Sequence, residues 1–139
     1  MMELAIDGKV YQFRFGMGFL REIDKTVEVP LSGIPGKKEN IGLQMAVRYL
    51  VGGDVVTLVD VLDTANKTET PRVTKAMLDS YIEDENTDID KLFEDTLDFL
   101  KNANATKKET NKVLKEKEEQ TAKLEELKAK VEEMSKKLK

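Results

Sequence analysis

The chain has 139 residues, of which 36% are charged and 40% hydrophobic, and its formal net charge is −4. It contains no His, Cys or Trp, so it lacks the imidazole and thiol groups that most often transfer protons or act as nucleophiles near neutral pH. A disulfide framework is excluded, and no apolar run approaches the ~20 residues that a membrane span needs. These features predict a soluble cytoplasmic protein that is not an enzyme.

Charge and composition divide the chain into two predicted regions. Residues 1–105 carry 12 basic and 19 acidic residues, a net charge of −7, and are expected to form one compact helical domain. Residues 106–139 carry 11 Lys and 8 Glu, a net charge of +3, with no Gly, Pro or aromatic residue. Because an acidic body repels phosphate backbones, we expect no binding to nucleic acid.

The first predicted element is a β-hairpin. Asp7-Gly8 is a favoured two-residue turn between alternating segments at residues 2–6 and 9–15. Pairing Ile6 with Lys9 places five apolar side chains on one face, namely Leu4, Ile6, Tyr11, Phe13 and Phe15. That face requires a cover, because an isolated hairpin is only marginally stable in water.

Five helices are predicted to supply this cover, each from a start signal or an apolar stripe. They run from Met17 to Thr26, from a cap at Asn40 to Val51, from a cap at Asp54 to about Ala65, from a cap at Thr70 followed by Pro71, and from a cap at Asp88. A loop is expected between Glu28 and Lys38, where Pro and Gly residues gather. The last helix has no strong breaker after it, so it could either end before the tail or run on into it.

Each predicted helix has an apolar stripe that is expected to face the core. The inward residues are Leu20 and Ile23; Ile41, Met45 and Tyr49; Val55, Leu58, Val59 and Leu62; Val73, Met77 and Tyr81; and Ile89, Leu92, Phe93, Thr96, Leu97 and Leu100. The predicted fold class is therefore α+β and mainly α, with an N-terminal β-hairpin packed on about five helices and a long charged C-terminal helix.

The residues between Asp84 and Asp90 are the strongest metal candidate. Oxygen-bearing side chains at alternate positions resemble the start of a calcium loop, but Ile89 stands where a Gly is needed and Asp95 where a bidentate Glu is expected. We therefore expect an acidic turn with no bound metal and no cofactor. The carboxylate pairs Asp60 with Asp63 and Asp95 with Asp98 are interpreted as solvated helix faces.

The tail carries an evenly spaced aliphatic seam. Its members recur at intervals of three and four, the spacing of a helix that packs lengthwise on another helix; they are Leu124, Leu127, Val131, Met134 and Leu138. Extending the register upstream adds Val113, Lys117 and Gln120. The seam predicts partner binding, whereas favourable Glu and Lys pairs four residues apart could also support a single solvated helix.

Three segments of the body together resemble a known family. They are Tyr11 to Ile23, Asp54 to Lys67, and Pro71 to Lys108, and the likeness covers about residues 2 to 108. They are similar to the tail assembly chaperones of long-tailed (siphovirus-type) bacteriophages that infect Gram-positive bacteria. No catalytic motif contributes to this resemblance.

The resemblance implies a small helical protein that acts in the host cytoplasm. It implies binding to the tape-measure protein, which the chaperone keeps soluble, and recruitment of the tail-tube protein, with the chaperone absent from the mature tail. It also implies that Lys107-Lys108 could mark a frameshift site. Because the tail departs from the family's pattern, residues 109–139 could be an unshifted C-terminus, a frameshifted extension or a joined segment. The alternative from the residues alone is an oligomeric coiled-coil adaptor that associates with itself through the seam.

Overall fold

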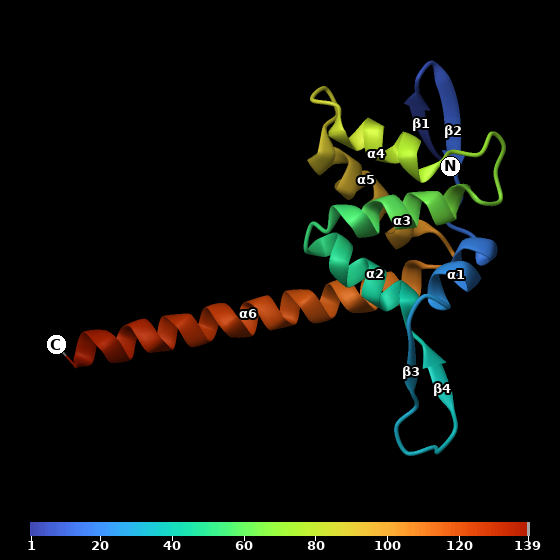
Figure 1. Ribbon diagram of the computed structural model, residues 1–139. Coiled ribbons are helices and arrows are strands. Elements are labelled where there is room, and N and C mark those ends of the chain that lie inside the picture. The colour runs from blue at the N-terminus through green and yellow to red at the C-terminus, as the bar shows by residue number, and fades with distance from the viewer. Residues whose placement is uncertain (139) are drawn as a thin grey trace.

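The computed structural model describes residues 1–138, which form six helices and two separate β-hairpins (Figure 1). The elements are β1 (Met2–Ile6), β2 (Lys9–Phe13), α1 (Met17–Asp24), β3 (Glu28–Pro30), β4 (Lys38–Asn40), α2 (Gly42–Val51), α3 (Val55–Asn66), α4 (Lys75–Glu83), α5 (Ile89–Asn102) and α6 (Lys107–Lys137). The predicted class, α+β and mainly α with an N-terminal hairpin and a long C-terminal helix, is confirmed.

The N-terminal hairpin has the predicted register. Ile6 pairs with Lys9 and Leu4 with Tyr11, and the turn residues Asp7 and Gly8 have φ values of 51° and 79°, as a primed two-residue turn requires. Ile6, Tyr11, Phe13 and Phe15 are buried, and Leu4 packs against them while partly exposed. Met2 is also buried, because it lies opposite Phe13 on the same face.

The segment predicted as a loop between Glu28 and Lys38 is a second hairpin, so that prediction is wrong. β3 and β4 pair antiparallel, with Val29 opposite Glu39. Gly33 and Gly36 have φ values of 82° and 78°, which only Gly adopts readily. Gly33, Pro35 and Gly36 therefore lie in the turn of a hairpin, whereas Pro30 ends β3, and this hairpin extends away from the helices in Figure 1.

Two helices begin later than predicted. α2 starts at Gly42 rather than after a cap at Asn40, because the Ile41 N–H donates to the Val27 carbonyl. α4 starts at Lys75, and Thr74 caps it by accepting a hydrogen bond from the Met77 N–H. The residues after Thr70 are held against the end of α3 by Asn66, which prevents them from entering the helix.

The inward faces of several helices also differ from the prediction. α2 buries Leu43, Ala46, Val47 and Leu50, while Tyr49 is 51% exposed. This helix contacts α1, α3, α5 and α6. Its fully aliphatic stripe faces these helices, and the predicted stripe with Met45 and Tyr49 does not. Prediction also missed Phe19 in α1, Val61 and Ala65 in α3, and Leu78 in α4, which are all buried, whereas Val55 is exposed.

The last body helix does not continue into the tail. α5 begins after the predicted cap Asp88, whose carboxylate accepts from the Lys91 N–H, and it ends at Asn102. A turn follows, in which the Thr106 hydroxyl donates to the Leu100 carbonyl at 2.7 Å. This turn redirects the chain, so that α6 starts against the body and then extends far beyond it (Figure 1).

Candidate partner-binding surface

The start of α6 is built into the body. α2 and α5 both pack on this helix, and Thr110 and Val113 are buried in the contact. The Arg48 guanidinium of α2 lies 2.8 Å from the Glu116 carboxylate of α6. These contacts fix the direction in which the rest of α6 leaves the body. The division into residues 1–105 and 106–139 stays a prediction. The buried core includes Val113, which lies beyond the predicted boundary.

The predicted seam lies on the part of α6 that extends beyond the body (Figure 1). All five of its side chains are more than half exposed, at 53% for Leu124, 58% for Leu127, 58% for Val131, 64% for Met134 and 86% for Leu138. Exposed aliphatic side chains that follow one register on a helix are typical of a surface that binds another helix. Their assignment to a partner stays a prediction.

Two ion pairs within α6 support the exposed helix. The Lys130 Nζ lies 3.5 Å from a Glu126 carboxylate oxygen, and the Lys137 Nζ lies 3.8 Å from a Glu133 oxygen. Exposed pairs of this spacing contribute only ~0.2 to 0.5 kcal/mol each to a helix. They therefore stabilise the exposed part of α6 only slightly, and they do not cover its apolar seam.

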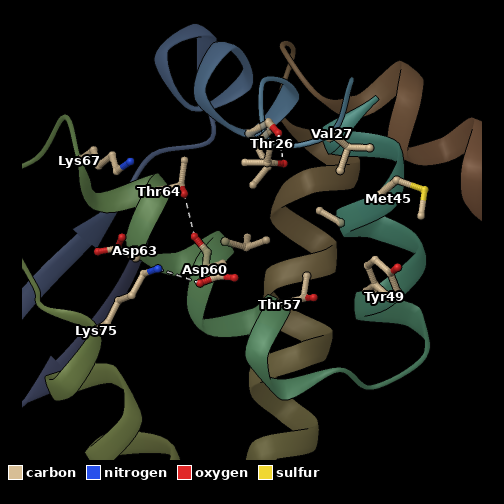
Figure 2. Close-up of a pocket in the computed structure, with 14 residues that line it drawn as sticks. Thr26, Val27, Met45, Tyr49, Thr57, Asp60, Asp63, Thr64, Lys67 and Lys75 are labelled. Carbon is tan, nitrogen blue, oxygen red and sulfur yellow. Dashed lines mark hydrogen bonds and ion pairs between the residues drawn. The ribbon is translucent and has the colours of Figure 1, made fainter. Parts of the chain in front are cut away.

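The body has an open pocket of about 340 Å³ between α1, α2 and α3 (Figure 2). Ile23, Ala46 and Val61 are among the residues that line it, and Asp60 and Lys75 lie at its polar side. The Asp60 carboxylate lies 3.0 Å from the Lys75 Nζ, and this hydrogen bond, with the charge of Asp60, raises the pKa of Lys75 above its usual value. Lys75 therefore remains a paired cation at neutral pH, unsuited to act as a base or nucleophile.

The acidic clusters noted in the sequence are engaged in local contacts. Asp63 pairs with Arg72 and Asp95 with Lys91, while a carboxylate oxygen of Asp84 accepts from the Asn86 N–H. Within residues 1–138 no group of three His, Asp or Glu side chains is placed to hold a metal ion. None of the described helices is long and apolar enough to cross a membrane.

Sequence reasoning missed the contacts that position the helices. Arg48 and Glu116 are 68 residues apart, and the Asp24 carboxylate accepts from the Leu43 N–H at 3.0 Å, 19 residues away. No local pattern marks such pairs. The sequence offered no signal for the second contact, because Asn40 looked like a cap for α2, whereas the structure shows no capping side chain at its start.

The fold defines a small, mainly helical protein with one long helix that extends beyond the body and carries an exposed aliphatic seam. A family model described as "Phage tail assembly chaperone protein, TAC" matches residues 3–116. The match covers most of the chain and ends where α6 leaves the body, and the chain belongs to this family. No curated protein and no solved structure matches the chain significantly.

Proposed function

We propose that this tail assembly chaperone binds the tape-measure protein through the seam of α6 and keeps that protein soluble until the tail tube encloses it. The proposal includes recruitment of the tail-tube protein, release of the chaperone before the tail matures, and action in the host cytoplasm. The resemblance of the three body segments, read together, further supports a siphovirus-type phage with a Gram-positive host as the source.

The observation that supports this function is the exposed seam on a helix whose base is fixed. A long helical client with apolar stripes aggregates unless those stripes are covered, and a helix with an aliphatic seam covers one by lengthwise packing. The seam spans about two heptads, and Lys117 and Gln120 interrupt it near the body. A contact of this size can be displaced, as a chaperone that leaves its client requires.

A co-expression experiment tests the proposal. Replacing Leu127 and Val131 with Asp places two unpaired charges in the helix contact, where burial disfavours them strongly. We expect the double variant to lose the tape-measure protein in a pull-down and to leave that protein insoluble. The melting temperature of the body should not change, because both side chains are exposed.

A matched control adds the same charge elsewhere on the same helix. Ala122 and Ala129 are exposed and lie on the side of α6 away from the seam, so replacing both with Asp should leave client capture intact. If the Leu127 and Val131 variant retains the tape-measure protein as well as this control does, the seam is not the client-binding element.

A further inference from the structure

The charges beside the seam of α6 have one sign. In heptad letters, Leu124, Val131 and Leu138 occupy a, and Leu127 and Met134 occupy d. The flanking e and g positions within residues 123–137 hold Lys123, Lys128, Lys130, Ser135 and Lys137, with no acidic residue. The four Glu residues of the same segment, Glu125, Glu126, Glu132 and Glu133, all occupy b or c, on the side away from the seam.

The start of the same helix shows how such a flank is used. In this register Thr110 is at a and Val113 at d, and both are buried where α2 and α5 cover α6. Glu116 occupies the flanking g position, and the covering helix α2 supplies the opposite charge, Arg48, at 2.8 Å. In the covered part of the seam, the flanking charge of Glu116 is therefore paired with a residue of another helix. Among the described residues, the flanking lysines of the exposed part have no such partner from another helix.

Flanking lysines discriminate between partners. In a parallel pair of two copies, Lys123 at g would face Lys128 at e of the other copy, and an antiparallel pair brings g to g and e to e, again with Lys opposite Lys. These like charges disfavour the pairing of two copies of α6, whereas a different helix with Asp or Glu at its own e and g positions would be attracted by the lysines. The ion pairs of Lys130 and Lys137 with Glu126 and Glu133 are exposed and are weak enough to be exchanged.

We propose that α6 selects a helix whose apolar seam is flanked by Asp and Glu, and that it rejects a second copy of itself. This inference rests on the proposed function, since it gives the chemistry of the client segment. The client helix is expected to span about two to three heptads, which matches the exposed seam. Its acidic flanks contact the lysines, and its aliphatic residues cover Leu127, Val131 and Met134.

Two synthetic helices test this selection on the full chain. Both have the same Leu seam of about three heptads, and they differ only in carrying Glu or Lys at every e and g position. We expect the Glu peptide to bind at least about tenfold more tightly than the Lys peptide, as measured by titration calorimetry. The difference should shrink as salt rises above about 0.15 M, because exposed charge pairs are screened.

Charge-reversed variants give the decisive comparison. Replacing Lys123, Lys128, Lys130 and Lys137 with Glu should reverse the order of the two peptides. The control replaces Lys108, Lys112, Lys115 and Lys136 with Glu, which changes the net charge equally at exposed positions away from the seam, and it should keep the original order.

Three results would overturn the inference. They are equal binding of both peptides, binding of neither peptide, and a dimer in sedimentation that Leu127→Asp and Val131→Asp dissociate. Equal binding would leave the seam as a helix-binding surface, so the proposed function would stand. Capture of the tape-measure protein by the Leu127 and Val131 variant would instead remove the proposed function, whatever the peptides do.

Discussion

At the scale of single residues, Asn66 joins three segments of the body. Its fully buried carboxamide donates to the Gln12 carbonyl at 2.9 Å and to the Pro71 carbonyl at 3.2 Å, and it accepts from the Val73 N–H at 2.6 Å. Asn66→Ala would leave these backbone groups without partners, at ~1 to 3 kcal/mol for each group that stays buried. We predict a loss of about 3 kcal/mol in the free energy of unfolding.

Denaturant titration measures this loss, and Asn102→Ala is its control. The Asn102 side chain is exposed and donates only to the Asp98 carbonyl one helical turn earlier. The control should lose less than about 0.5 kcal/mol, as is usual for exposed substitutions. Equal losses in the two variants would show that Asn66 does not hold the hairpin to the end of α3.

The exposure of the seam was predictable from its residues, whereas the role of Asn66 was not. Leu124 to Leu138 lie in a local pattern of steps of three and four, and the structure leaves them exposed as a surface that can bind a partner. Asn66 is one of several polar residues in α3, and its partner Gln12 is 54 residues away. Such a network depends on tertiary contacts that no window of sequence contains.

At the scale of elements, the contact between α1 and α2 depends on a glycine. A Cβ on Gly42 would lie 1.7 Å from the Ile23 carbonyl oxygen, so the two helices can approach only without a side chain there. Gly42→Ala must move one helix, and we predict a cost of about 3 kcal/mol, as for an overpacked core. Thermal or denaturant unfolding of the full chain measures it.

Gly52→Ala, at the C-cap of the same helix, provides the comparison. Gly52 has a helical φ of −76°, and its nearest neighbour would lie 3.5 Å from an added Cβ. This substitution should be neutral or stabilise by up to about 1 kcal/mol, because Ala reduces the freedom of the unfolded chain. Gly42→Ala with a similar result would contradict the close approach of α1 and α2.

Sequence patterns predicted some of these elements correctly and failed for α2. The register of the first hairpin and the cap at Asp88 were predictable, because a short turn motif or a single capping residue determines each of them. The start of α2 was not, because its Leu43 N–H is satisfied by Asp24 from α1. Its buried face was also missed, since the Met45 and Tyr49 stripe and the Leu43 and Val47 stripe are both apolar and only the packing of four helices selects one.

At the scale of the whole molecule, the protein combines an acidic helical body with a basic helix that extends from it (Figure 1). The body fixes the base of α6 through Val113 and the Arg48–Glu116 pair. The exposed remainder gains little from its own ion pairs. Its stability should therefore rise when a partner covers the seam, because isolated helices of this length are marginal in water.

Amide hydrogen exchange tests the central claim most directly. The full chain would be measured alone and in its co-purified complex with the tape-measure protein, with exchange followed by mass spectrometry. We predict that residues 120–138 exchange much more slowly in the complex, whereas the buried part of α2 changes little, because it is already protected by the core. Slower exchange in the body alone, with residues 120–138 exchanging as fast as in the free protein, would contradict the assignment of the α6 seam as the client-binding surface.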